Sequence, residues 1–220
     1  MFSHTINPKK IKINTVNYCA VPFGYRCTSA LACAYANIRK FSLPFDWVMP
    51  LFPNKIKKIL ENDFNDYIPD VHNGIFFNIY DIELVHFNDN IDKGIDEYKR
   101  RIDRFRNIIK QPTHLYFIYT NEDYLTKSQY RTEEFNNNMF NEMLDLENYL
   151  KKYISNYTII YFSFTRHNIP ANSNIINIII HTNQYDVNFK IVEQFRIYCG
   201  KILSTLFKTQ LNIDSFTFND

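Results

Sequence analysis

Apolar runs of strand length alternate along this chain with segments whose apolar residues recur every three or four positions. Short continuous apolar runs are typical of strands buried on both faces, and the longer spacing is typical of amphipathic helices. The alternation predicts an α/β fold in a single domain over all 220 residues. We expect a mainly parallel central sheet of at least five strands, with helices on both faces. The expected strands include residues 16–21, 115–119, 159–164 and 176–180.

The helical spacing is clearest in residues 91–105, where Ile91, Ile95 and Tyr98 begin the apolar face and Asp89 or Asp92 could cap the first turn. Residues 74–87 hold two further strand-like runs, which we interpret as one long strand or a hairpin. The other expected helices cover residues 28–40, 54–61, 135–150 and 189–206.

Composition excludes several classes of protein. With 45% hydrophobic and 17% aromatic residues, the chain is not of the disordered class. A net charge of +2 gives no bulk attraction to nucleic acid or to anionic lipid. From this charge we expect no nucleic-acid partner. No window of 18 apolar residues occurs, so we also expect no membrane partner.

The four cysteines are too few and too scattered for a secreted disulfide framework, and no signal-peptide pattern opens the chain. We therefore expect reduced thiols in an intracellular, cytoplasmic protein. The abundance of Asn, Ile, Lys, Phe and Tyr reflects AT-rich codons, which are typical of some large DNA viruses, bacteria and protists. A viral source would place the protein in the host cytoplasm or in the virion.

Cys27 follows the first expected strand and begins the next expected helix. Helix N-termini carry partial positive charge and free N–H groups, and both stabilise a thiolate. Arg26 adds a cation, and Gly24 lets the backbone approach a ligand closely. These features predict a nucleophilic thiol of lowered pKa. The alternative is a buried structural cysteine. We interpret the remaining cysteines as core residues: Cys19, Cys33 and Cys199.

A cysteine nucleophile needs a base, and His86 lies near the end of an apolar run, where the carboxyl end of a strand would face a ligand. Asn88 or Asp89 could orient its imidazole. Each histidine taken singly is better interpreted as a surface or hydrogen-bonded residue. The cysteines and histidines lack zinc-site spacing, and the common glycine-rich nucleotide motifs do not occur. The sequence therefore predicts no metal and no cofactor.

Arginines form a second candidate site, because their planar forks bind carboxylates and phosphates bidentately. Arg26 lies beside Cys27, while Arg100 and Arg104 share a face of the helix at 91–105. Together they could bind an anionic or sugar-containing ligand. The alternative for the two helical arginines is a solvated face, partly paired with neighbouring acids.

Two stretches of the chain resemble a known family. Residues 23–30 are F-G-Y-R-C-T-S-A, and residues 42–47 are S-L-P-F-D-W. This combination is similar to a G-x-x-C-x-x-A element, a helix and an S-x-P-F-D-W element in the papain-like cysteine peptidase family, a domain of unknown function found in bacteria and large DNA viruses. Residues 86–89 and the basic helix at 98–105 also resemble that family.

The resemblance implies Cys27 as nucleophile, His86 as base, and Asp89 or Asp46 as a third, orienting group. It also implies a papain-like α+β fold as the alternative to the parallel sheet. The function that we expect first is a cysteine-dependent hydrolase acting on a peptide or a glycoconjugate. The alternatives are a non-catalytic α/β domain that binds an anionic or sugar-containing ligand, and a viral structural or accessory protein. The oligomeric state is left open.

Overall fold

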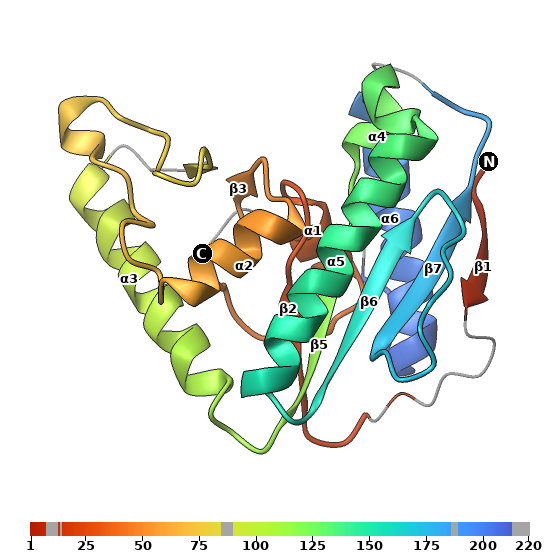
Figure 1. Cartoon of the computed structure of the whole chain (residues 1–220), viewed down its shortest axis with the longest axis horizontal. Helices are drawn as coiled ribbons and strands as arrows, with labels where there is room; N and C mark the ends of the chain where they lie inside the picture. The colour runs from red at the N-terminus through yellow and green to blue at the C-terminus, as the bar shows by residue number, and fades with distance from the viewer. Residues whose placement is uncertain (8–12, 14, 85–89, 186–188, 213–220) are drawn as a thin grey trace.

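The computed structural model describes residues 1–7, 13, 15–84, 90–185 and 189–212. Their centre is a five-stranded sheet in the order β1-β7-β6-β5-β2 (Figure 1). Four strands are mutually parallel: β2 (Tyr18–Pro22), β5 (His114–Tyr119), β6 (Tyr157–Ser163) and β7 (Ile175–His181). The fifth, β1 (Ser3–Asn7), runs antiparallel to β7 at one edge. The mainly parallel α/β architecture expected from the sequence is confirmed.

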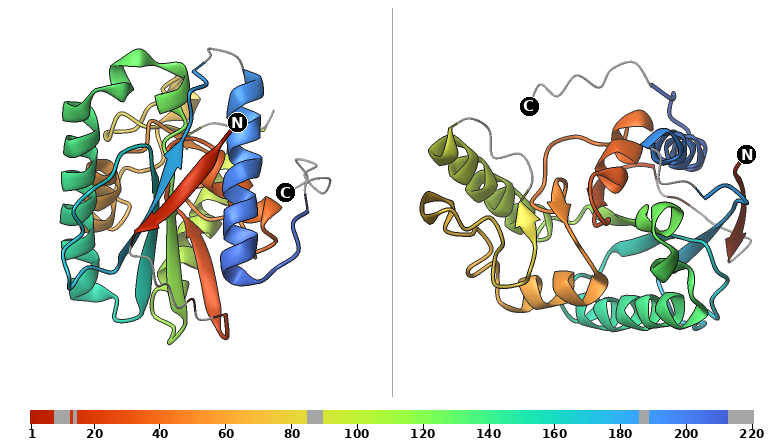
Figure 2. Two further views of the ribbon diagram at one scale, coloured as in Figure 1. Left: turned by 90° about the vertical axis from the view of Figure 1, so that its right-hand side faces the viewer. Right: turned by 90° about the horizontal axis from the view of Figure 1, so that it is seen from above.

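Helices cover both faces of this sheet, as Figure 2 shows. On one face lies α5 (Glu133–Tyr153), and on the other α1 (Thr28–Tyr35) packs beside α6 (Phe189–Phe207). Successive residues of β5 point to opposite faces, so Phe117 joins the core beneath α5 while Ile118 joins the core beneath α1 and α6. Both faces of the strand are therefore buried, which explains its continuous apolar run.

The chain between β2 and β5 builds a lateral extension, seen on the left of Figure 1. After α1, which packs on the sheet, the extension contains β3 (Val48–Met49), α2 (Pro53–Glu61), a short 3₁₀ turn (Val71–Asn73), β4 (Glu83–Leu84) and α3 (Ile91–Ile108). Strands β3 and β4 pair with each other, apart from the central sheet. Between β5 and α5 lie α4 (Asp123–Thr126) and a second 3₁₀ turn (Ser128–Arg131).

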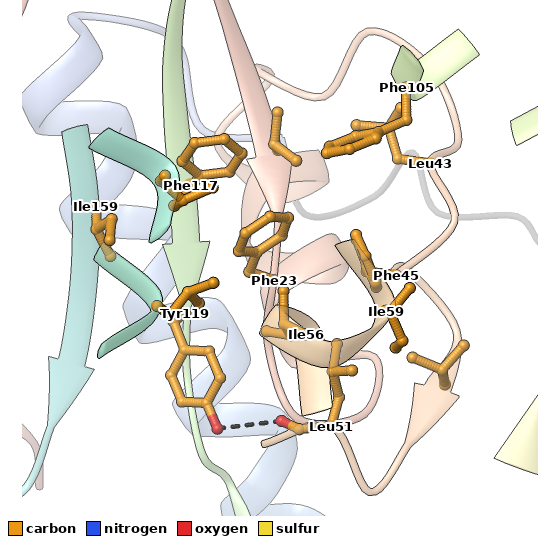
Figure 3. Close-up of a cluster of buried hydrophobic side chains, with 14 of the residues drawn as sticks. Phe23, Leu43, Phe45, Leu51, Ile56, Ile59, Phe105, Phe117, Tyr119 and Ile159 are labelled. Atoms are coloured by element: carbon orange, nitrogen blue, oxygen red, sulfur yellow. Dashed lines mark hydrogen bonds between the residues drawn. The ribbon is translucent and has the colours of Figure 1, made fainter. Parts of the chain in front are cut away.

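Aromatic side chains join this extension to the central sheet (Figure 3). Phe23, just after β2, stacks on Phe117 with ring centroids 4.4 Å apart and meets Phe45 edge-on at 5.0 Å. The hydroxyl of Tyr119 donates to the carbonyl of Leu51 at 3.1 Å. Such aromatic pairs contribute about 0.5–1.5 kcal/mol beyond the burial of their area.

Several expected boundaries differ from the structure. The first central strand begins at Tyr18 rather than residue 16, and α1 ends at Tyr35 because the chain reverses through Asn37 at φ 54°. His4 lies in β1, an edge strand that the sequence did not predict. Helix α3 is capped by Asn90, whose side chain accepts a hydrogen bond from the N–H of Lys93 at 3.0 Å, and not by an aspartate.

The strand-like runs of residues 74–87 are only partly paired. Glu83–Leu84 forms β4, and Phe77 forms a single antiparallel bridge with Glu83, as in a hairpin. Residues 85–87 lie outside the described residues. Among the helices that the structure describes, none is both long enough and apolar enough to cross a bilayer.

Candidate functional site

Cys27 occupies the N-cap of α1, immediately beyond the carboxyl end of β2. Pairing with β5 continues past the strand, because the N–H of Tyr25 donates to the carbonyl of Thr120 at 2.9 Å. Arg26 then turns the chain into the helix with a left-handed φ of 57°. Ligands of parallel sheets bind at this edge, so the structure places Cys27 where the sequence led us to expect it.

Gly24 allows this turn to be tight. A Cβ atom at Gly24 would lie 1.6 Å from the Ser29 hydroxyl oxygen and 2.6 Å from the Ser29 Cβ. The Ser29 hydroxyl in turn lies 3.0 Å from the hydroxyl of Thr120. The close approach of Gly24 to the first turn of α1 is therefore a steric requirement of the fold.

Cys27 differs from the other cysteines in its exposure. The other three are buried, as expected, while Cys27 is partly exposed. Within the described part of the chain, its side chain makes no capping hydrogen bond to α1. The Cys27 side chain is therefore not used to cap this helix.

The resting thiol is not acidic. Burial raises the pKa of Cys27 to about 11, and the nearby carboxylates of Glu122 and Asp46 act in the same direction. The cations of Arg196 and Arg26 lower the pKa but do not outweigh burial. The expected lowering of this pKa is wrong for the resting protein, because removal from water disfavours the thiolate more than the nearby positive charge favours it.

A buried ionic cluster lies beside the Cys27 thiol. The Arg196 Nη2 donates to both carboxylate oxygens of Glu122 at 3.2 and 3.1 Å, and its Nε lies 3.3 Å from the Thr28 hydroxyl. The Nε of Arg26 lies 3.4 Å from a carboxylate oxygen of Asp123. Glu122 and Asp123 are both buried. Burial is the main cause that raises the pKa of Glu122, and Arg196 opposes it.

These acids and Arg196 were missed in the sequence. Glu122 and Asp123 follow the strand expected at 115–119, so the argument from strand ends that selected Cys27 also applied to them. Arg196 carries no comparable local signal, because it lies within an ordinary amphipathic helix, 74 residues from its partner Glu122.

Asp46 forms a salt bridge with Arg39 that stabilises a turn. Its carboxylate is fully buried and accepts hydrogen bonds from the Arg39 Nη2 at 2.7 Å and Nε at 3.1 Å. The same carboxylate oxygen accepts the N–H of Leu43 at 3.1 Å, and Arg39 also donates to the Ser42 hydroxyl at 2.8 Å. Asp46 therefore closes the turn of the S-x-P-F-D-W element, and its pKa is raised by burial against the effect of Arg39.

His86 and Asp89, the expected base and its orienting acid, lie outside the described residues. The described histidines have partners other than Cys27. His4 contacts Tyr198, His72 contacts Asp92, His114 contacts Thr158, His167 contacts Thr165 and His181 contacts Thr5.

The three candidate anion-binding arginines separate into two places. Arg100 and Arg104 line one depression of about 500 Å³ on α3, together with Phe41. Arg104 donates to the carbonyl of Ser42 at 2.5 Å, and its guanidinium lies 5.5 Å from the Phe41 ring centroid. Arg26 does not line this depression and pairs with Asp123 instead.

The chain is thus a mainly parallel α/β protein with a partly exposed cysteine at the turn from β2 into α1. No known protein family, no curated protein and no solved structure matches the chain significantly. The resemblance of residues 23–47 to papain-like peptidases therefore stays a prediction.

Proposed function

We propose that this protein is a cysteine-dependent hydrolase in which Cys27 is the nucleophile and His86 the general base. The observation that carries the proposal is the position of Cys27. Among the cysteines it is the partly exposed one, and it begins a helix at the ligand-binding edge of a parallel sheet. In the ionic cluster beside it, Arg196 and Arg26 lower the pKa of the thiol and Glu122 raises it.

The raised pKa determines the type of chemistry. With a pKa of about 11, roughly one thiol in ten thousand is ionised at neutral pH. In the proposed mechanism a base takes the thiol proton at the moment of attack. In this scheme His86 takes the thiol proton as the sulfur bonds to the carbonyl carbon of the substrate.

The remaining steps use groups near the turn. The electrons of the carbonyl double bond move to its oxygen, which the N–H groups at the start of α1 would stabilise. Collapse of this intermediate expels an amine or alcohol, which takes the proton from the imidazolium. Water then hydrolyses the thioester on Cys27. Arg196 stabilises negative charge on the sulfur, since it is the cation that most lowers the Cys27 pKa.

Acylation by an activated acyl ester tests the proposal without knowledge of the natural substrate. We expect p-nitrophenyl acetate to leave an acetyl group on Cys27, detected by peptide mass spectrometry, and to release nitrophenol in repeated turnovers. Cys27→Ala should abolish both signals, and His86→Ala should slow acylation by about a hundredfold, the lower range for general-base catalysis. Cys199→Ala, which removes a buried cysteine, is the matched control and should leave both unchanged.

The proposal fails if the acetyl group is distributed over all cysteines at similar rates, or if Cys27→Ala releases nitrophenol as fast as the unmodified chain. Acylation of Cys27 that is unaffected in His86→Ala would remove His86 from the mechanism and leave another group as the base.

A further inference from the structure

The segment at residues 75–79 exposes an unusual amount of apolar surface. Ile75, Phe76, Phe77 and Ile79 are 51%, 48%, 54% and 66% exposed. We call this segment the apolar loop. It lies in the part of the chain before β4, beside the N-terminal end of α3 (Figure 1). Contiguous exposed apolar residues mark interaction sites, whereas single ones are ordinary.

The apolar loop is held in place by buried polar groups. The Asn78 side chain donates to the carbonyl of Tyr67 at 2.8 Å and accepts the N–H groups of Tyr80 and Ile82 at 3.0 and 3.2 Å. Asn78 itself is buried. These hydrogen bonds hold Asn78 in the interior, and the apolar residues on either side of it are exposed to solvent.

Acidic residues surround the apolar loop. The carbonyl of Asp70 accepts the N–H of Ile75 at 3.1 Å, and Asp81 follows the loop directly in the next turn. Asp92 reaches His72, at the base of the same segment, at 3.2 Å. All three aspartates are exposed. One cation, Lys55, donates to the carbonyl of Asp81 at 2.8 Å. This acidic rim disfavours an anionic membrane and favours a basic partner surface.

The same chain carries such a surface in the depression on α3. Phe41 and Ile108 supply its apolar part, and Arg100 and Arg104 supply its positive charge. Its acid, Asp103, lies 3.2 Å from the Arg106 Nη1, and Arg106 also pairs with Asp63 at 3.0 Å. The two arginines outnumber this acid, so the charge of the lining residues is positive. A volume of about 500 Å³ lies within the range of sites that take large apolar groups.

We propose that the apolar loop of one molecule docks in the α3 depression of a second copy of this chain. Phe76, Phe77 and Ile79 would cover Phe41 and Ile108, while the aspartates around the loop meet Arg100 and Arg104. Arginine forks bind carboxylates bidentately, so this pairing would also orient the contact. The association does not depend on the chemistry proposed for Cys27.

The two surfaces lie towards opposite ends of α3. The apolar loop lies at the N-terminal end of the helix, and most residues of the depression come from its C-terminal half. Each copy therefore presents both halves of the contact at once, so two copies with antiparallel α3 helices can close a symmetric dimer, and other arrangements extend into short chains or rings. The contact is small, so we expect weak association that increases with protein concentration.

Sedimentation velocity on the full chain, from micromolar to near-millimolar concentration, tests the proposal. The wild type should form dimers or longer species as concentration rises. The loop variant Phe76→Ser/Ile79→Ser and the depression variant Arg100→Glu should each weaken association by at least about tenfold. Tyr153→Ser and Lys99→Glu are matched controls, because they change an exposed aromatic residue elsewhere and a neighbouring exposed lysine that does not line the depression. Both controls should associate as the wild type does.

Mixing the two defective variants tests whether the apolar loop and the α3 depression contact each other. The loop variant keeps an intact depression and the depression variant keeps an intact loop, so the mixture should form one-to-one dimers that do not extend. A wild type that stays monomeric throughout overturns the proposal, including the case in which it binds phosphatidylcholine vesicles through the loop. A mixture that stays monomeric overturns the contact between the loop and the depression.

Discussion

Cys27 is subject to opposing electrostatic effects within a few residues. The helix N-terminus, Arg196 and Arg26 favour a thiolate, while burial and Glu122 disfavour it. Glu122 has a double role, because it also neutralises Arg196, the cation that most favours the thiolate. Burial is the largest cause of the raised Cys27 pKa, and Glu122 is the carboxylate that contributes most to it.

Replacing this carboxylate should make Cys27 more acidic. In Glu122→Gln the amide oxygen can still accept a hydrogen bond from Arg196, but the negative charge that raises the Cys27 pKa is gone. We expect the pKa to fall by about one unit, which corresponds to about tenfold faster alkylation at neutral pH. The pH dependence of iodoacetamide labelling at Cys27, followed by mass spectrometry, measures the change.

Glu142→Gln is the control, since Glu142 is a half-buried carboxylate on α5 whose charge acts on Tyr119 and Tyr161. It should leave the labelling profile of Cys27 in place. An unchanged profile in Glu122→Gln would show that burial alone sets the pKa of this thiol.

At the level of secondary-structure elements, the turn from β2 into α1 depends on Gly24. The N–H groups of Phe23 and Tyr25 extend the pairing with β5, so the chain cannot move away from α1 without breaking these bonds. The glycine thereby brings the first turn of the helix against Thr120, at the end of the neighbouring strand.

Gly24→Ala should destabilise the protein by about 1–3 kcal/mol, because the new methyl group overlaps Ser29. Ser29→Gly removes both the hydroxyl and the Cβ that the methyl group meets. In that background we expect Gly24→Ala to cost less, and urea unfolding of the four chains of this double-mutant cycle measures the difference.

Gly74→Ala provides the comparison. Gly74 has a φ of 76°, and no atom lies within 4 Å of the position that its Cβ would take, so the cost of the substitution is backbone strain and not overlap. Ser29→Gly should leave that cost unchanged. Equal costs for Gly24→Ala in both backgrounds would mean that the turn relaxes away from α1.

Across the molecule as a whole, His167 couples stability to pH. The imidazole is buried and stacks on Phe140 with ring centroids 4.3 Å apart, and it lies 3.0 Å from the Thr165 hydroxyl. Burial lowers its pKa from 6.5 to about 4. The folded protein therefore binds fewer protons than the unfolded chain between these two pH values.

It follows that the contribution of His167 is fully present above pH 6.5 and is lost as pH falls towards 4. The loss amounts to at most roughly 3 kcal/mol. The raised pKa values of Asp46 and Glu122 act in the opposite direction, since protonation of those buried carboxyls is favoured in the fold. Urea unfolding at a series of pH values should show that His167→Phe flattens this decline.

His72→Gln is the control, because His72 is an exposed histidine paired with Asp92. Its profile should follow that of the wild type between pH 4 and 6.5. A decline of equal slope in His167→Phe would assign the acid sensitivity to other groups.

Local apolar periodicity was enough to predict the parallel sheet, its covering helices and the place of Cys27. A strand buried on both faces must be continuously apolar wherever it lies in the fold, as β5 shows. The edge strand β1 was missed because its residues are mostly exposed and carry no such pattern. Its pairing with β7 is decided by a contact across more than 160 residues of chain.

The protonation state of Cys27 and the partners of the charged candidates depend instead on how the chain packs. Glu122 meets Arg196 across 74 residues, and Asp46 meets Arg39 within a buried turn, so neither pairing has a fixed spacing to detect. Burial reverses the effect that the helix N-terminus and Arg26 were expected to have on the thiol. The reason is that a residue's type and local position set its possible charge, whereas the water and charges that packing leaves around it set its pKa.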